Sequence, residues 1–322
     1  MVNERKYPGS LHNHTQYSNA RLRDCIIKED ELLKYAVELG HEVVAITDHE
    51  SVMNAVKVEK AYKKIKEKNP DFKVVFGNEI YLCRNGLNST NFVAGQDKYY
   101  HFILLAKDAI GHQQIREIST RAWRRSYMAR GMRRVPTYYQ DLIDIVGAEP
   151  GHVVGSTACL GGFLDTKLLQ WVRSGRPDQL YQQIIGWVQN MENIFGKGNF
   201  YLEMQPSAND EQECANKELF NLSQITGVPY IITTDTHYLK KVDAPIHKAF
   251  LNSQDGDREV DSFYATTYLM STDELESYFP YFSKIQLATA YSNIEKIKDG
   301  CEDFSLLKEL KIPSLDWGET PH

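Results

Sequence analysis

Short apolar, β-branched segments recur along the chain, and most are followed by a stretch with apolar residues at helical spacing. This alternation is typical of βα units, which bury a sheet beneath helices and can close into a TIM-like barrel. The pattern predicts about seven strands, over residues 10–14, 42–47, 73–76, 101–106, 152–156, 199–204 and 229–233. Apolar residues at i, i+3 and i+4 predict helices over residues 29–39, 53–67, 111–126, 138–146, 179–194 and 210–225.

The alternation fades from about residue 244 onward. The sequence there is mostly helical in pattern and rich in tyrosine, as in DELESYFPYFSKIQLATAYSNIEKIKD, and two prolines fall in its last twelve residues. We therefore expect an α/β barrel over residues 1–243 and a mostly helical C-terminal extension over residues 244–322, packed on the barrel.

Groups that can bind metal ions gather in, at or just after the predicted strands. His12 and His14 are two residues apart in the first strand, so both imidazoles point to the same face. Asp235 and His237 repeat this spacing after the seventh strand. Barrels of this type place their chemistry at the carboxyl ends of the strands. We therefore expect these two pairs to lie close to five further candidate ligands at that end of the barrel. Each of the five comes from a different segment of the chain: Asp24, His49, Glu79, His101 and Cys159.

The mixture of imidazole, carboxylate and thiolate groups suits zinc, manganese or iron(II). Each residue alone has an ordinary interpretation: His101 as a hydrogen-bonded histidine, Cys159 as a small buried apolar residue, Asp24 as a solvated loop residue. Nine groups are too many for one ion but would serve two or three divalent ions if one carboxylate, with Glu79 as the candidate, bridges a pair. Two ions about 3.5–4 Å apart can hold a phosphate between them and lower the pKa of a water molecule.

A stretch after the fourth predicted strand combines arginines with aromatic residues, among them Trp123, Tyr138 and Tyr139. Phosphate-pairing charge beside stacking surfaces suits single-stranded nucleic acid. The alternative is that these arginines, Arg121 included, only solvate a helix face or pair with acidic residues. The hypothesis of a DNA contact rests on Arg124, Arg125, Arg130, Arg133, Arg134 and Tyr127.

The amino-acid composition excludes several classes of protein. The net charge of −6 and a pI near 6.0 argue against a protein that holds nucleic acid through its overall charge, so any such contact is regional. Five widely separated cysteines without a CxxC pair indicate neither a disulfide framework nor a zinc knuckle, which favours a cytoplasmic protein. No apolar run approaches the roughly 20 residues needed to span a bilayer, so we expect no membrane contact.

The segments LHNHTQYS, AITDH, GNEI, YHFILLA, STACLGG and TTDTHY resemble, in order and spacing, the motifs of the PHP (polymerase and histidinol phosphatase) superfamily. The resemblance covers nearly the whole chain and is greatest to the N-terminal domain of bacterial and phage-type DNA polymerase III alpha subunits. It implies a distorted (β/α)7 barrel with three metal ions. Their ligands would be His12, His14, Glu79 and Asp235 for one ion; Glu79, His101 and Cys159 for a second; and Asp24, His49 and His237 for a third.

The loop NARLRDC is longer than we expect from the family, so Glu29 or Asp30 stays an alternative to Asp24. The resemblance implies a metal-dependent phosphoesterase, and we expect a 3′–5′ proofreading exonuclease with Glu79, Asp235 and His237 as catalytic residues. Its partners would be single-stranded or frayed 3′ ends of DNA, and the remaining polymerase domains or replisome subunits. No polymerase active site is expected within these 322 residues. Two alternatives stay open: a phosphatase for a small phosphomonoester, and a docking domain in which the metals are structural.

Overall fold

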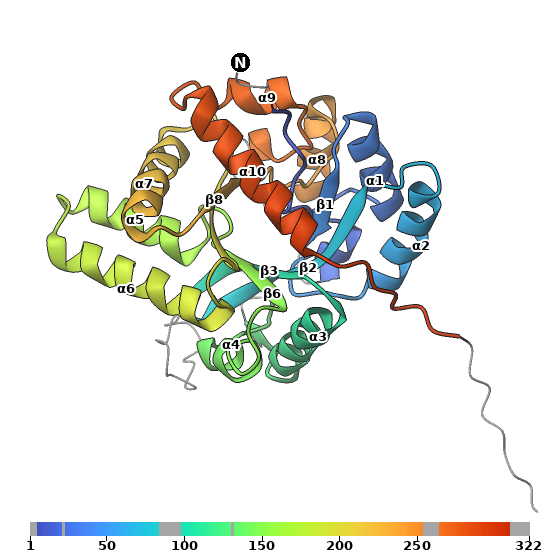
Figure 1. The fold of residues 1–322 in the computed structure, drawn as a ribbon, viewed down its shortest axis with the longest axis horizontal. Coiled ribbons are helices and arrows are strands. Elements are labelled where there is room, and N and C mark those ends of the chain that lie inside the picture. The colour runs from blue at the N-terminus through green and yellow to red at the C-terminus, as the bar shows by residue number, and fades with distance from the viewer. Residues whose placement is uncertain (1–4, 21–22, 84–97, 130–131, 254–263, 310–322) are drawn as a thin grey trace, which may run out of the picture.

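The computed structural model describes residues 5–20, 23–83, 98–129, 132–253 and 264–309. Within them, six strands form one curled sheet in the order β1-β2-β3-β6-β7-β8 (Figure 1). The strands are β1 (Val43–Ile46), β2 (Lys73–Cys83), β3 (Tyr99–Ala106), β6 (Val153–Ser156), β7 (Phe200–Met204) and β8 (Tyr230–Ile232). Each overlaps a predicted strand, and helices cover the sheet, so the predicted α/β barrel-like class is confirmed.

The first predicted strand, residues 10–14, is the exception, because it is extended but joins no regular ladder. On one side the Ala45 N–H donates to the Ser10 carbonyl at 3.0 Å. On the other side the His14 N–H donates to the Thr236 carbonyl at 2.9 Å, just beyond β8. The segment therefore lies between the two edge strands and closes the curled sheet into a ring.

A glycine lets this segment approach β1 closely. Gly9 has a φ of +135°, a conformation that side chains other than glycine rarely adopt. A Cβ atom at this position would lie 1.9 Å from the carbonyl oxygen of Val43. Any larger residue would push the following HxH segment away from the sheet.

Strand β3 runs antiparallel to both of its neighbours, β2 and β6, whereas the other pairs in the sheet are parallel. His101 stands near the start of β3, opposite Tyr81 in the second half of β2. In a wholly parallel barrel the first residues of a strand lie at the end remote from the catalytic face. The reversal of β3 instead brings His101 to the same end as the residues that follow the other strands.

Seven helices belong to the barrel region of the described chain: α1 (Glu29–Glu38), α2 (Ala55–Lys66), α3 (Ala109–Arg124), α4 (Tyr139–Ile145), α5 (Phe163–Arg173), α6 (Asp178–Phe195) and α7 (Asp210–Thr226). Six of them confirm the predicted helices to within a few residues. Helix α5 was missed, because its eleven residues lie between Gly162 and Gly175, which in sequence resemble the borders of a loop. Gly40 and Gly227 follow α1 and α7 with φ of +78° and +75°, as expected of C-terminal stops.

The C-terminal extension contains α8 (Ala244–Leu251), α9 (Thr272–Ser277) and α10 (Lys284–Gly300). Helix α10 runs along the sheet beside β8 (Figure 1), where Tyr230 donates its hydroxyl to the Gln286 carbonyl at 2.9 Å. One hydrophobic core contains Phe102 of the sheet together with Leu287 and Ile294 of α10. The extension therefore packs on the barrel, while the division at residue 243 stays a prediction.

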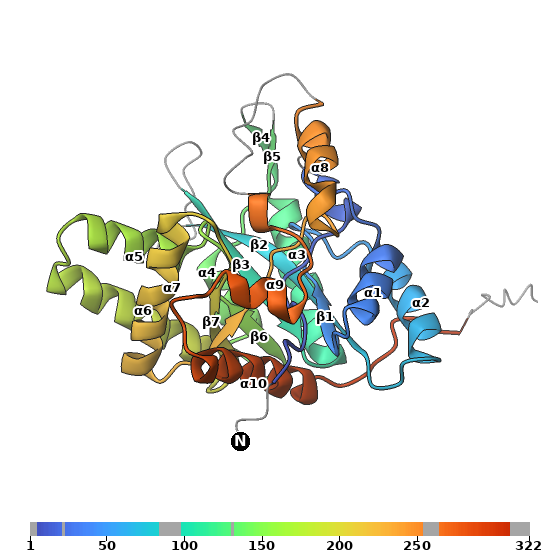
Figure 2. The same ribbon diagram turned by 90° about the horizontal axis from the view of Figure 1, so that it is seen from above.

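A short hairpin, β4 (Tyr127–Ala129) and β5 (Met132–Arg134), was not predicted. Figure 2 shows it projecting from the body of the protein on the same side as α8. Three 3-10 turns complete the described elements: Gln16–Ala20, Lys241–Asp243 and Tyr264–Thr266. None of the helices in the described ranges is long and apolar enough to cross a bilayer.

Candidate metal centre

Residues from six separate segments bring their side chains together at one end of the ring. Three groups place their nitrogen, oxygen or sulfur atoms within 4.8 Å of one another. The groups are His12, His14, Glu79 and Asp235; Glu79, His101 and Cys159; and His14, His49 and His237. Because Glu79 and His14 each belong to two groups, the three form one continuous, buried cluster suited to several metal ions.

In the first group, the donor atoms of His12, His14, Glu79 and Asp235 lie close together. The Nε2 atoms of His12 and His14 lie 3.2 Å apart. Each lies 3.1–3.2 Å from Asp235 Oδ1, and 3.4 and 3.1 Å, respectively, from Glu79 Oε2. All four side chains are buried.

The hydrogen bonds on the far side of each ring show which nitrogen carries the proton. His12 Nδ1 lies 2.6 Å from Glu203 Oε1, which can only accept, so this nitrogen donates. His14 Nδ1 lies 3.0 Å from Ser18 Oγ, whose own proton is donated to Asp48 at 2.8 Å. In neutral rings both Nε2 atoms therefore present lone pairs to each other and to carboxylate oxygens, an arrangement that a metal ion or added protons must compensate.

Two carboxylates of the cluster, those of Glu79 and Asp235, face imidazole nitrogens and have oxygens with no assigned hydrogen-bond donor in the described part of the chain. Among the described residues, neither oxygen of Glu79 nor Oδ1 of Asp235 accepts a hydrogen bond, although all three atoms are buried. Unpaired buried carboxylates cost several kcal/mol unless a cation compensates them. The residues present thus fit divalent metal ions, with nitrogen and oxygen donors directed at common points.

Protonation of the imidazoles is the alternative way to compensate the negative charge of the buried carboxylates. Burial lowers the pKa of His49, but the carboxylates of Glu79 and Asp24 outweigh it and raise this pKa to about 9. Burial likewise acts to raise the pKa of Glu79, yet the imidazoles of His49, His101 and His12 hold it well below its usual range. Protons and metal ions compete for the same nitrogens, so metal binding here releases protons and weakens as the pH falls.

The second group opens toward solvent. His101 Nδ1 lies 2.7 Å from Glu79 Oε1 and 3.4 Å from the sulfur of Cys159. Burial and the carboxylates of Asp235 and Glu79 raise the pKa of the Cys159 thiol well above its usual range, so a bound cation is needed to hold it as a thiolate. The His101 side chain is 25% exposed, whereas those of His49 and Asp24 are 9% and 6% exposed. A substrate would therefore reach the cluster past His101.

The third group, His14, His49 and His237, lies beside Asp24, the aspartate whose placement was least certain. Asp24 Oδ2 lies 2.7 Å from His49 Nε2 and 3.0 Å from His237 Nε2. His237 Nδ1 donates to the Asp235 carbonyl at 2.7 Å, so its Nε2 presents a lone pair to Asp24. Asp30 pairs with Lys34 on the surface of α1, where Glu29 also stands. Of these three acids, Asp24 is therefore the one that lies beside His49 and His237, and its role as a ligand stays a prediction.

Two buried acids that support the cluster were missed. Glu203 on β7 accepts from His12 and, at 2.5 Å each, from the hydroxyls of Ser156 and Thr233. Asp48, beside His49, accepts from the Thr15 N–H at 2.6 Å and from Ser18. One signal for Glu203 was available: it is the only charged residue in the apolar strand FYLEM.

Replacing Glu203 by glutamine should weaken metal binding about 10- to 100-fold, as is typical when a partner of a ligating histidine is removed. The amide can present its NH₂ group to His12 Nδ1 and so favour the wrong tautomer. Metal content after dialysis, measured by elemental analysis, tests this expectation. Glu218→Gln, which alters a buried acid paired with Arg176 on the surface, is the control and should retain full metal content.

The members of the predicted arginine patch lie in different parts of the structure. Arg125 binds Asp141 through two hydrogen bonds of 2.6 and 2.5 Å, so its guanidinium is already paired within the protein. Arg124 lies at the end of α3, and Arg130 lies outside the described residues. The hairpin carries three further members of the patch: Tyr127, Arg133 and Arg134.

The base of the hairpin is joined to the strand that bears His101. The hydroxyls of Tyr127 and Tyr99 are hydrogen-bonded, and the guanidinium of Arg134 lies 5.6 Å from the centre of the Tyr99 ring. Tyr99 and His101 are two residues apart on β3 and so face the same side. The hairpin therefore stands next to the opening of the metal cluster.

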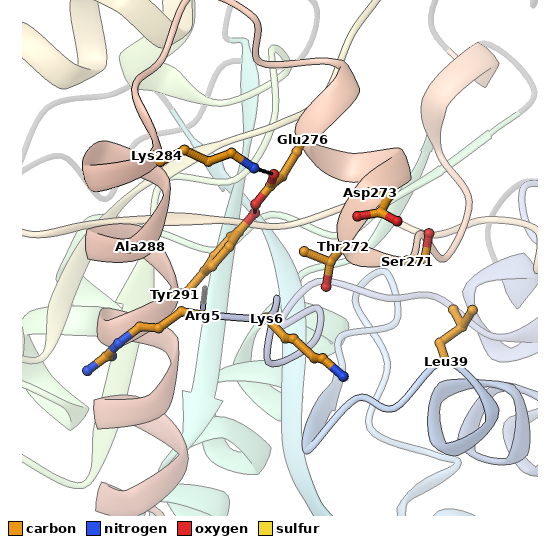
Figure 3. Close-up of a pocket in the computed structure, with 10 residues that line it drawn as sticks. All are labelled: Arg5, Lys6, Leu39, Ser271, Thr272, Asp273, Glu276, Lys284, Ala288 and Tyr291. Atoms are coloured by element: carbon orange, nitrogen blue, oxygen red, sulfur yellow. Dashed lines mark hydrogen bonds and ion pairs between the residues drawn. The ribbon is translucent and has the colours of Figure 1, made fainter. Parts of the chain in front are cut away.

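A cavity elsewhere does not belong to this site. Figure 3 shows it between the N-terminal segment, α9 and α10, with a volume of about 570 Å³. None of the nine predicted ligands lines it, and its Glu276 already pairs with Lys284. This cavity is therefore separate from the buried cluster of candidate metal ligands.

Comparison with known proteins gives a consistent assignment. The PHP domain family matches residues 10–207. The chain is 36% identical over 316 residues to the DNA-directed DNA polymerase of Bacillus phage SPbeta, covering 95% of this chain and 24% of that protein. It is 31% identical over 251 residues to DNA polymerase III subunit alpha of Aquifex aeolicus, covering 76% and 19%. The chain thus spans about a quarter or less of the length of these relatives.

A solved structure, of a Bifidobacterium adolescentis protein assigned as a metal-dependent phosphoesterase, superposes with a TM-score of 0.41 and 14% identity over 71% of this chain and 87% of that one. The family match spans well over half of the chain and includes seven of the nine predicted ligands. Both that match and the relation to polymerase sequences agree with the resemblance seen in the motifs. The chain belongs to the PHP domain family.

Proposed function

We propose that this chain is a metal-dependent phosphoesterase that removes nucleotides from the 3′ end of single-stranded DNA. The observation that carries the proposal is the buried cluster around Glu79, in which imidazole nitrogens, carboxylate oxygens and a thiol converge. Such a cluster serves ions that act on phosphate oxygens. The kinship with DNA polymerases supports DNA as the source of that phosphate.

Two or three divalent ions, of zinc, manganese or iron, would supply a Lewis acid and a nucleophile at neutral pH. The chain's own residues bind and orient them. Glu79, which contacts imidazoles through both oxygens, would bridge two ions, and Asp235 would share the ion held by His12 and His14. His237, fixed by its bond to the Asp235 carbonyl, would hold the third with Asp24 and His49.

The route to the cluster favours a strand with one free end. The ligands are buried apart from His101, so the scissile phosphate has to enter beside this ring. Tyr99 offers an aromatic face two residues away, and Arg134 and Arg133 stand on the adjoining hairpin. Stacking on such faces and pairing with arginine are how proteins hold single strands without reading their sequence.

The test is hydrolysis of a single-stranded oligonucleotide labelled at either end, with Mn²⁺, Zn²⁺ or Fe²⁺ supplied in turn. We expect label at the 5′ end to yield a ladder that shortens one nucleotide at a time, and label at the 3′ end to be released as a mononucleotide. Rapid turnover of p-nitrophenyl phosphate with no ladder under any metal would replace the exonuclease by a phosphomonoesterase.

Substitution of Arg134 by alanine should raise KM for single-stranded DNA while leaving kcat nearly unchanged, because the side chain lies near the opening but contacts none of the nine ligands in the described structure. Removing one arginine–phosphate pair should also make the salt dependence of binding shallower by about 0.7 in log–log slope. Arg121→Ala, which removes an arginine paired with Glu117 on α3, is the control. Equal effects of the two substitutions would remove the hairpin from the DNA path.

A further inference from the structure

The C-terminal extension contacts the loop that carries Asp24. Tyr264, in the turn Tyr264–Thr266, donates its hydroxyl to Asp24 Oδ1 at 2.8 Å. His247 on α8 donates Nε2–H to the backbone carbonyl of Asp24 at 2.5 Å. The neighbouring Arg23 bonds Ser253 and lies over the ring of Phe250.

The two oxygens of the Asp24 carboxylate therefore have different partners. Oδ1 accepts from Tyr264, and Oδ2 faces His49 Nε2 and His237 Nε2 at 2.7 and 3.0 Å. The backbone of the loop is held separately, because Asn19 accepts from the N–H groups of Asp24 and Cys25. Tyr264 thus fixes the orientation of the carboxylate rather than the course of the chain.

We propose that Tyr264 and His247 are positioning residues that hold Asp24 as a ligand through Oδ2 alone at the His49–His237 end of the cluster. The inference rests on the proposed metal centre and deepens it, because it places completion of one ion site in the C-terminal extension. Neither residue lies in the range matched by the family. Without the phenol, Oδ1 has no hydrogen-bond donor among the described residues, and the carboxylate can rotate away from the two imidazoles.

The test measures metal rather than activity. In Tyr264→Phe, affinity for one ion per chain should fall about 10- to 100-fold, the usual effect of removing a partner of a ligand. Zn²⁺ and Mn²⁺ titrations of the full chain, with elemental analysis after dialysis, give affinity and stoichiometry. Asp24→Asn should lose the same ion. Tyr281→Phe, which removes a hydroxyl bonded to Asn216 on α7, is the matched control and should bind metal as the parent does.

A purely structural role predicts a different result. Melting temperatures of Tyr264→Phe should equal those of the parent after chelation and fall below them once metal is added, whereas a fold defect would lower both equally. If Tyr264→Phe does not fold, His247 gives a second pair: leucine should lose the ion, and glutamine, which can still donate to the Asp24 carbonyl, should keep it.

Full affinity for every ion in Tyr264→Phe, or equal melting defects with and without metal, would overturn the inference. Its failure is distinguishable from failure of the proposed function. If the parent protein binds metal but does not cleave DNA, the metal titrations still decide the role of Tyr264. If Tyr264→Phe binds metal normally while the parent degrades DNA, only the positioning role is refuted.

Discussion

Glu79→Gln should reduce hydrolysis of single-stranded DNA by about 10³-fold or more. The neutral amide matches the carboxylate in shape but cannot bridge two cations as an anion, and each tenfold drop in rate corresponds to about 1.4 kcal/mol less transition-state stabilisation. Both Glu79 oxygens contact imidazoles that would share those ions. Rates with 3′-labelled oligonucleotide under saturating metal give the measurement. Alanine at His14, Glu79 or Asp235 should have the same effect.

The fold of Glu79→Gln should survive, because glutamine matches glutamate in shape and leaves the packing around this position unchanged. Circular dichroism and a melting curve after chelation check this. Glu42→Gln, at an exposed glutamate that pairs with Lys298, serves as the matched control and should retain full activity. A Glu79→Gln protein free of host nucleases that keeps more than a tenth of the parent rate would refute the mechanism.

Removal of metal should abolish hydrolysis and lower stability at the same time. Each ion that binds the folded chain alone contributes about 4 kcal/mol when present at 1,000 times its Kd. Denaturant unfolding of chelated and reloaded protein measures the difference, and adding back one ion type at a time identifies which of zinc, manganese or iron restores the rate. The cluster should stay formed at low occupancy, because hydrogen bonds to Glu203 and Ser18 orient His12 and His14.

This experiment also separates an enzyme from a docking domain. A chain whose metals are structural would unfold on chelation and show no hydrolysis with any metal added back. Asp235→Asn is the informative control, because it should lose most of the metal-induced stabilisation while its chelated form unfolds as the parent does. Reloaded parent protein that regains stability without any hydrolysis would contradict the catalytic proposal.

The sequence was sufficient to predict most of the sheet and to find the candidate ligands. Residues two apart on an extended segment share a face, so the pair His12–His14 could be found without any knowledge of the fold. The pair Asp235–His237 was found by the same spacing, although Asp235 has a φ of +46° and is not extended. Helices with regular apolar spacing, such as α1 and α7, were found to within one or two residues. These are local properties, which the order of residues determines directly.

What was missed depends on interactions between distant segments. The spacing of YHFILLA does not show that β3 runs antiparallel, yet this reversal decides where His101 lies. The pairing of Arg125 with Asp141, 16 residues away, could not be predicted from the sequence, and the role of Arg125 in DNA binding stays a prediction. In the sequence, Glu203 is one acidic residue in an apolar strand. Its hydrogen-bond partner His12 lies 191 residues earlier, so their contact could not be predicted from local spacing.

The way the ring closes has a consequence for folding. The segment of residues 8–14 completes the barrel by meeting the chain beyond β8, so partners such as Ser10 and Thr234 are 224 residues apart. Pairings of such long sequence separation form late, since a large loop must be closed first. His12 and Asp235 are drawn from the two sides of this junction. A ribosome-bound chain that has not yet produced residue 237 therefore lacks two of the nine candidate ligands, Asp235 and His237, and we expect complete ion loading to follow closure of the ring.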